Sequence, residues 1–337
     1  MRIESFIVWC LSALLSLWTA SATASAVETQ SRALQRASDA VVGLTAKAIE
    51  DARSSATLGS QRQGSGVVIS PDGLVLTIGY LILEAEDVEI ATDDGRQLPA
   101  RVVGYDLATG FGLVQSLVPM KLEPVPLGEA AVLMAQSPLV VVSGGQAGAV
   151  SMARLVSRRP FSGNWEYHIE GALFTAPARR DHSGAGLFND QGELVGIGSL
   201  WVADAMGVPG GPRQQGNMFV PIDLLKPMLQ ELRTRGVGPA SARAWMGLQA
   251  AETDAGLRVL RVNEDSPADV AGIEPGDTIV SIDGQGVRTL EALWKTLWSG
   301  GPPERDVQLQ LLRQGKPMAV TVHSVDRMKA MKRPKGV

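Results

Sequence analysis

Cysteine and histidine, which often carry nucleophilic catalysis or bind zinc, are rare in this chain. The sequence holds one cysteine, Cys10, and three histidines, His168, His182 and His323, which lie far apart. Neither set has the spacing of a thiolate-rich or histidine-rich metal site, so we expect no metal and no cofactor. Residues 144–148 lack a third glycine at the spacing of a dinucleotide-binding loop, and no capped helix follows them, so we interpret them as a turn.

Ser183 is a candidate nucleophile next to a glycine, in a turn. A serine attacks a carbonyl efficiently when a histidine takes its proton and a carboxylate orients that histidine. His182 is adjacent in the chain, but neighbouring side chains on a tight turn diverge. Glycine-flanked serines are also common in ordinary turns, so Ser183 needs partners from elsewhere in the chain.

The composition is that of an ordinary globular protein without an excess of positive charge. Hydrophobic residues make up 45% and charged residues 20% of the 337 residues, and the net charge is -4. The length is sufficient for two domains. Neutralising phosphates requires a basic surface, so nucleic acid is excluded as the main partner.

The first 26 residues have the order of a secretory signal peptide. Arg2 precedes an apolar stretch from Phe6 to Trp18, and small residues with an Ala-x-Ala site follow up to Ala26. The apolar stretch is shorter than the roughly 20 residues of a membrane span. We therefore expect cleavage after Ala26 and a folded part outside the cytoplasm; an uncleaved N-terminal anchor is the alternative.

The following two hundred residues consist mainly of short apolar runs and turns. Residues 64–70 and 74–77 are apolar runs on either side of the Pro-Asp-Gly turn at 71–73, which predicts a hairpin. Similar turns recur along the region, which favours an antiparallel barrel or sandwich over a βαβ fold. A helix is expected to begin at Asp223 and to end at Gly236.

A second, smaller unit follows a linker. Residues 236–244 are small, contain Gly and Pro and lack periodicity, which is typical of a linker. The unit after it has an expected strand at 257–260, a helix capped by Thr289, and two further strands within 307–322. Residues 326–337 are interpreted as a solvated basic tail.

Strings of residues in both units resemble the HtrA family of periplasmic trypsin-like serine proteases. Residues 27–235 resemble the trypsin-like domain of that family, and residues 245–325 resemble its PDZ domain. The strings that carry the resemblance are residues 64–73, Ser183-Gly184 and residues 219–222 in the first unit, and Trp245-Met246-Gly247-Leu248, residues 266–268, 271–277 and 282–284 in the second. The resemblance implies a mainly β fold, with a trypsin-like double antiparallel β-barrel followed by a small α+β PDZ domain.

The same resemblance implies that the catalytic triad is incomplete. The family's histidine stands in a Thr-Asn-Asn-His-Val string, and the aligned residues 77–81 place Tyr80 there. The family's orienting aspartate aligns with Gly110, so Ser183 alone survives. Asp181 replaces the glycine whose N–H, with that of Ser183, forms the oxyanion hole, and an ionised carboxylate opposes negative charge there unless it points away. A phenol with a pKa of about 10 is a poor general base at neutral pH.

The resemblance also implies a peptide-binding groove in the second unit. A PDZ domain adds the peptide as a strand and holds its terminal carboxylate with backbone N–H groups. The expected groove residues are Trp245, Met246, Gly247, Leu248 and Ala250 on the loop and strand, and Leu290, Leu293, Trp294 and Leu297 on the helix. We expect Gly247 to face the groove, so that a bulky residue there blocks the carboxylate site without unfolding the module.

Together these features predict a periplasmic HtrA-like pseudoprotease. It would bind protein C-termini or unfolded polypeptides through its PDZ domain, as a scaffold, regulator or chaperone, and an active HtrA relative is a further expected partner. The alternative is an active serine endopeptidase of protein quality control with a rearranged site. Relatives often form trimers through aromatic residues near the mature N-terminus, and residues 27–40 contain none, so a homo-oligomer stays open and a trimer is not predicted.

Overall fold

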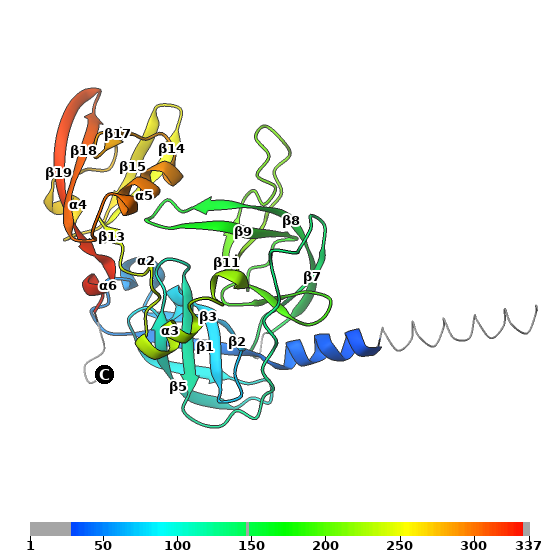
Figure 1. The fold of residues 1–337 in the computed structure, drawn as a ribbon. Helices are drawn as coiled ribbons and strands as arrows, with labels where there is room; N and C mark the ends of the chain where they lie inside the picture. Colours follow the sequence, from blue (N-terminus) through cyan, green and yellow to red (C-terminus); the bar gives the residue numbers. More distant parts are fainter. Residues whose placement is uncertain (1–27, 146–147, 333–337) are drawn as a thin grey trace, which may run out of the picture.

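The computed structural model describes residues 28–145 and 148–332. Figure 1 shows two β-barrels side by side, with a smaller unit of strands and helices beside them and a helical segment, residues 28–39, extending away from the body. The expected signal peptide, residues 1–26, lies outside the described residues. Within the described ranges, no helix is both long enough and apolar enough to cross a membrane.

The first barrel is closed by six antiparallel strands in the order β1-β2-β3-β6-β5-β4. Its strands are β1 (Val41–Ala48), β2 (Gln61–Val68), β3 (Leu74–Ile78), β4 (Ala85–Ala91), β5 (Gln97–Tyr105) and β6 (Phe111–Ser116). The expected hairpin joins β2 to β3, and Gly73 closes its turn at a φ of 84°, which glycine adopts without steric cost. Two short helices accompany this barrel, α2 (Ser55–Leu58) and the 3-10 turn η1 (Gly79–Leu81).

The second barrel repeats this arrangement in the order β10-β11-β12-β9-β8-β7. Its strands are β7 (Pro138–Val142), β8 (Val150–Ser162), β9 (His168–Ala176), β10 (Gly186–Phe188), β11 (Leu194–Val202) and β12 (Gly216–Pro221). The β8–β9 hairpin is long and reaches beyond the barrel toward the smaller unit (Figure 1). Buried side chains of both barrels form one large apolar cluster, which holds the barrels together.

The helix expected from Asp223 to Gly236 is divided in the structure. A 3-10 turn, η2 (Ile222–Leu224), and the helix α3 (Leu229–Arg235) are separated by turns around Pro227, which lacks an N–H for a continuous helix. Asp223 does not cap a helix; its carboxylate accepts from the N–H of Ala131 at 2.8 Å. The expected end is confirmed, because Gly236 terminates α3 in the left-handed conformation.

The smaller unit has its own sheet and its own apolar core. Its elements are β13 (Ala244–Trp245), β14 (Leu248–Thr253), β15 (Gly256–Val262), α4 (Pro267–Val270), β16 (Thr278–Ile282), β17 (Gln285–Gly286), α5 (Leu290–Ser299), β18 (Arg305–Arg313), β19 (Lys316–Asp326) and α6 (Arg327–Ala330). The predicted caps are present: the side chain of Ser266 accepts from the Asp269 N–H, and that of Thr289 accepts from the Ala292 N–H. The predicted mainly β fold is therefore confirmed.

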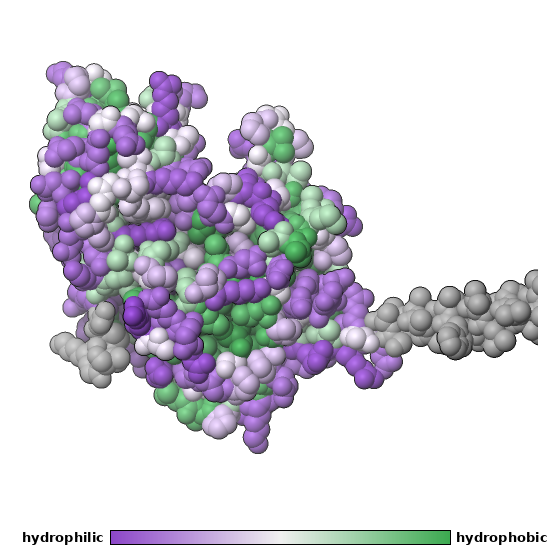
Figure 2. All heavy atoms as spheres, in the orientation of Figure 1, coloured by the Kyte–Doolittle hydropathy of each residue, from purple (hydrophilic) through white to green (hydrophobic). Residues whose placement is uncertain are grey.

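The interpretation of residues 326–337 as a solvated tail is wrong for their first part. Asp326 ends β19 and caps α6, and the N–H of Lys332 donates to Glu84 of the first barrel at 2.9 Å. Residues 333–337 lie outside the described residues. Hydrophilic side chains cover most of the face seen in Figure 2, with an apolar area near its centre over the first barrel.

Candidate active site and peptide groove

Tyr80 and Ser183 meet between the two barrels. The η1 turn after β3 carries Tyr80, and the loop before β10 carries Ser183, 103 residues further along the chain. The N–H of Ser65 on β2 donates to the Ser183 carbonyl at 2.8 Å, which joins the serine loop to the first barrel. The next residue, Gly184, has a φ of 73°, and a Cβ there would lie 2.0 Å from the Ser65 carbonyl, so this turn requires glycine.

The phenol of Tyr80 contacts two oxygen atoms, and its single proton decides the direction of both hydrogen bonds. Its hydroxyl lies 2.8 Å from Ser183 Oγ and 2.8 Å from the Ser199 carbonyl oxygen. A carbonyl oxygen can only accept, so the phenol satisfies both contacts when it donates to Ser199 and accepts the proton of Ser183. Tyr80 thus stands where a base would receive the proton of the serine.

Tyr80 is nevertheless a weak base in this environment. Burial raises the pKa of Tyr80 to about 12, although the hydrogen bond with Ser183 opposes the shift. The phenol is therefore neutral at pH 7, and the oxygen that faces Ser183 belongs to a hydroxyl whose own proton is committed to Ser199. Such an oxygen orients the serine hydroxyl and is a weak acceptor of its proton.

Gly110, the position expected for the orienting carboxylate, lies beside η1. The Gly110 carbonyl accepts from the N–H of Gly79 at 2.6 Å. Gly110 has a φ of 84°, and a Cβ built on it would lie 3.4 Å from the hydroxyl of Tyr167, which itself donates to the Thr109 carbonyl at 2.7 Å. A tyrosine of the β8–β9 hairpin therefore borders the space that an aspartate side chain would enter.

Asp106 is a buried carboxylate with other partners. It accepts from the N–H and hydroxyl of Thr109 and from the hydroxyl of Ser241. These bonds shape the turn that leads into β6 and fasten the linker before the smaller unit. Asp106 therefore has a structural role in this conformation.

The carboxylate of Asp181 is compensated by a cation. Arg179 forms a bidentate ion pair with it, and the hydroxyl of Ser143 donates to the same carboxylate. The hydrogen bond from Arg179 lowers the pKa of Asp181 to about 2, in spite of partial burial. The expected electrostatic conflict at the oxyanion position is reduced accordingly. His182 lies next to it, and its Nδ1 is 3.1 Å from the Arg179 carbonyl oxygen.

The expected carboxylate loop of the smaller unit already holds a carboxylate. The N–H groups of Met246 and Gly247 donate to Oε1 of Glu166 at 2.9 and 2.8 Å. Glu166 belongs to the turn between β8 and β9, and only 6% of its surface is exposed. Burial raises the pKa of Glu166, while the charge of Arg327 and the two N–H groups act in the opposite direction.

The expectation that Gly247 faces an open groove is wrong. Gly247 has a φ of 85°, and a Cβ there would lie 2.3 Å from Cβ of Ser266, so a bulky residue would strain the module itself. The expected helix wall mostly belongs to the core. Four of its side chains are buried against the sheet: Leu290, Leu293, Trp294 and Leu297. Trp294 also reaches the groove, since its Nε1–H donates to the Gly163 carbonyl at 2.9 Å.

A cleft of about 780 Å³ joins the two candidate sites. Its walls include Tyr80, Ser199 and Gly110 on the barrel side and Trp245, Leu248 and Arg261 on the side of the smaller unit. The turn that carries Glu166 forms part of the wall between them. Tyr80 and the groove residues Trp245 and Leu248 therefore border one cavity.

Two parts of the chain match known domain families, and the chain is similar to known proteases. Residues 64–197 match the trypsin-like peptidase domain, and residues 244–323 match the PDZ domain. The chain is 29% identical over 274 residues to the periplasmic pH-dependent serine endoprotease DegQ of Escherichia coli strain K12, covering 77% of this chain and 58% of that protein. It is 26% identical over 268 residues to the serine endoprotease DegS of Haemophilus influenzae, covering 77% of this chain and 76% of that protein. The chain is homologous to the HtrA serine proteases.

The fold agrees with solved structures of this HtrA group. The HtrA-type protease AlgW with a tripeptide superposes with a TM-score of 0.53 at 22% identity, over 91% of this chain and 99% of that one. The chain spans little more than half the length of the DegQ relative. The expected HtrA resemblance is confirmed, and so is the order of a trypsin-like domain followed by a PDZ domain.

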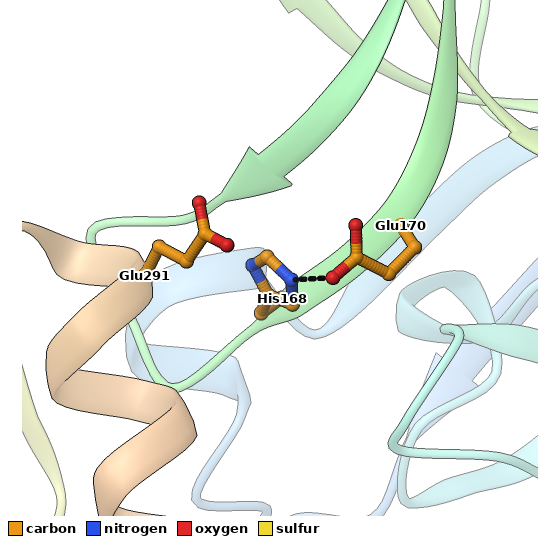
Figure 3. A group of neighbouring side chains, drawn as sticks. All are labelled: His168, Glu170 and Glu291. Carbon is orange, nitrogen blue, oxygen red and sulfur yellow. Dashed lines mark hydrogen bonds and ion pairs between the residues drawn. The ribbon is translucent and has the colours of Figure 1, made fainter.

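Within this HtrA homologue, a third group of side chains joins the second barrel to the PDZ helix. Figure 3 shows His168 and Glu170 on β9, with Glu291 of α5 on the other side of the imidazole. Their candidate ligand atoms lie within 4.8 Å of one another. Lys295 of α5 forms ion pairs with both carboxylates, Glu170 at 2.7 Å and Glu291 at 2.6 Å, so a cation of the chain itself compensates one of their two negative charges.

Sequence reasoning missed the turn between β8 and β9. Glu166 and Tyr167 contact the PDZ carboxylate loop and the surroundings of Gly110 respectively, and neither residue belongs to a motif of the family resemblance. The residues around them, Asn164-Trp165-Glu166-Tyr167, are polar and aromatic residues typical of a hairpin end. Nothing local in them indicates a contact with residues 80 positions further along the chain.

Proposed function

We propose that this HtrA homologue is a pseudoprotease whose working part is its PDZ domain. The observation that carries the proposal is the hydrogen bond between Tyr80 and Ser183, in which a neutral phenol occupies the place of the general base. Gly110 supplies no carboxylate to orient or charge that base. Without a base and its orienter, a serine protease retains only about 10³–10⁴-fold catalysis over water from its oxyanion hole and from substrate binding.

The PDZ domain then supplies the binding function. Such domains bind an extended peptide along a free strand edge and hold its terminal carboxylate on backbone N–H groups. In this chain β14 is the outer strand of its sheet, and the N–H groups of Met246 and Gly247 converge on one carboxylate oxygen. The binding partners are protein C-termini or unfolded polypeptides, and the chain acts on them as a scaffold, regulator or chaperone.

The site of action is the cell envelope. The DegQ relative is a periplasmic protein by its name, and the N-terminal residues of this chain have the order of a secretory signal. A partner of the same family is a further candidate, because two chains with similar barrels present similar surfaces. The proposed location and partners concern the whole protein.

An active endopeptidase is the rival function, because Ser183 is retained and its side chain is partly exposed. Two measurements on the purified protein distinguish the two functions. One is labelling by a fluorophosphonate probe, which reacts with activated serines, and the other is cleavage of casein. We expect neither labelling nor cleavage, with the variant Ser183→Ala as the matched control. Labelling or casein cleavage that is present in the native protein and lost in Ser183→Ala would overturn the pseudoprotease proposal.

A further inference from the structure

The turn between β8 and β9 of the protease-like domain lies in the peptide groove of the PDZ domain. Figure 1 shows the end of this hairpin beside β13 and α5. Three kinds of contact fasten it there. Glu166 accepts from the carboxylate loop, the Asn164 carbonyl accepts from the N–H of Ala250 on β14 at 2.7 Å, and the Gly163 carbonyl accepts from Trp294 on α5.

The side chain of Glu166 stands in for the C-terminus of a ligand. Both N–H donors are the backbone groups that a PDZ domain uses for a terminal carboxylate, and both point at a single oxygen, Oε1. The carboxylate is almost fully buried, so the two bonds are not shared with bulk water. Hydrogen bonds to an ionised acceptor are stronger than neutral ones.

The backbone of the turn also imitates the strand of a ligand. Asn164 precedes Glu166 by two residues, and its carbonyl accepts from the N–H of Ala250, the third residue of β14. An added peptide strand forms the same kind of main-chain hydrogen bond with that edge. Trp294 closes the other side of the turn from α5. The turn therefore occupies both the carboxylate site and the strand-pairing site.

Contacts within the protease-like domain hold the turn between β8 and β9 in this position. The indole of Trp165 stacks on the ring of Tyr167, with centroids 5.7 Å apart and an angle of 15° between the planes. Tyr167 is in turn bonded to the Thr109 carbonyl of the first barrel. The ion pair of Lys295 with Glu170 adds a contact outside the groove. A preorganised turn loses little conformational freedom when it binds.

We propose that the segment 163–166 is an intramolecular ligand that closes the PDZ groove, and that an external peptide with a free C-terminal carboxylate binds by displacing it. This inference rests on the proposed function of the groove and names its regulation. The competition is direct, since the internal and external carboxylates need the same two N–H groups. Peptides without a free carboxylate lack the group that replaces Glu166.

The displacement lowers the apparent affinity of the groove for external peptides. A tethered ligand competes with external peptides at an effective concentration on the order of millimolar. When the groove is open only part of the time, its apparent affinity for external peptides falls in proportion to the fraction of molecules in which it is open. The variant Glu166→Ala removes the internal carboxylate. We expect it to bind peptides at least about tenfold more tightly than the native chain, because losing two charge-assisted hydrogen bonds opens the groove.

Amide hydrogen exchange on the full chain tests the internal contact without any peptide. Mass spectrometry of fragments that cover residues 244–251 should show exchange at least about tenfold faster in Glu166→Ala than in the native protein. Glu166→Gln, which keeps the shape of the side chain but not its charge, should give a smaller increase. Glu123→Ala changes an exposed glutamate of the first domain and serves as the matched control, with exchange as in the native chain. Equal exchange in all four proteins would overturn the inference.

Peptide binding to the same full-length proteins tests the competition. The probes are fluorescein-labelled decapeptides that end in Val, Leu, Ile, Ala or Phe, each as the free acid and as the amide. Tighter binding of the free acids to Glu166→Ala supports the inference. Equal binding to the native chain and to Glu166→Ala overturns it and leaves the proposed function standing. Faster exchange in Glu166→Ala without binding of any free acid supports the internal contact, but it overturns both the displacement by external peptides and the proposed function.

Discussion

The replacement Tyr80→Phe removes one oxygen atom and both of its hydrogen bonds. The carbonyl of Ser199 loses its donor in a site where that residue is only 5% exposed. Ser183 loses an acceptor, but its partly exposed hydroxyl can turn to water. A lost hydrogen bond that leaves a buried group unpaired costs about 1–3 kcal/mol, so we expect Tyr80→Phe to lower the free energy of unfolding by about 2 kcal/mol.

The matched variant Ser183→Ala should have a smaller effect. The phenol of Tyr80 keeps its donor bond to Ser199 and loses only the proton that it accepts, for a cost of about 1 kcal/mol or less. In a domain of this size, about 1 kcal/mol corresponds to about 2–4 °C in Tm. We therefore expect Tm to fall by about 4–8 °C in Tyr80→Phe and by at most about 4 °C in Ser183→Ala.

Thermal unfolding followed by circular dichroism measures both values, and the double variant completes a thermodynamic cycle. The coupling energy should be about 0.5–1 kcal/mol, since the two residues share one hydrogen bond. Neither variant should gain fluorophosphonate labelling, because removing the phenol supplies no base. A Tyr80→Phe protein as stable as the native one, or a Ser183→Ala protein that loses more stability than Tyr80→Phe, would refute the assignment of these hydrogen bonds.

Three further predictions concern catalysis, pH and processing. The double replacement Tyr80→His with Gly110→Asp should leave casein uncleaved. Residue 110 has a φ of 84°, which an aspartate adopts at a cost of about 1–2 kcal/mol, and a tyrosine hydroxyl borders the space for its side chain. Casein hydrolysis by this variant would contradict the strain argument. The ion pair of Asp181 stabilises the fold above the unfolded pKa of that carboxyl, and this stabilisation is lost as the pH falls toward 2. Arg179→Gln removes the main cause of the lowered pKa, so we expect this variant to unfold at a higher pH in an acid titration followed by fluorescence. An unchanged midpoint would count against the ion pair. The secreted protein should begin at or within a few residues of Val27, and an intact mass that includes residues 1–26 would favour an anchor instead.

The order of strands, turns and caps could be predicted from the sequence because these features depend on neighbouring residues. Gly73 and Gly236 lie where the chain needs a left-handed backbone conformation. Ser266 and Thr289 precede helices, and their side chains accept hydrogen bonds from N–H groups in the first turn. The turns and caps need only the residues on either side and their spacing along the chain. The prediction of an incomplete triad at positions 80, 110 and 183 comes from the resemblance to the HtrA strings.

The roles of the same residues were decided by segments far away in the chain. Asp223 does not cap the helix that was expected to begin there, because its carboxylate accepts from the N–H of Ala131, 92 residues earlier in the chain. Gly247 faces Ser266 rather than an open groove. The groove itself is occupied by Glu166, which comes from the other domain and carries no motif. A hydrogen-bonding partner 80 or 100 residues away leaves no local pattern, because its position depends on how two barrels and a PDZ domain pack against one another.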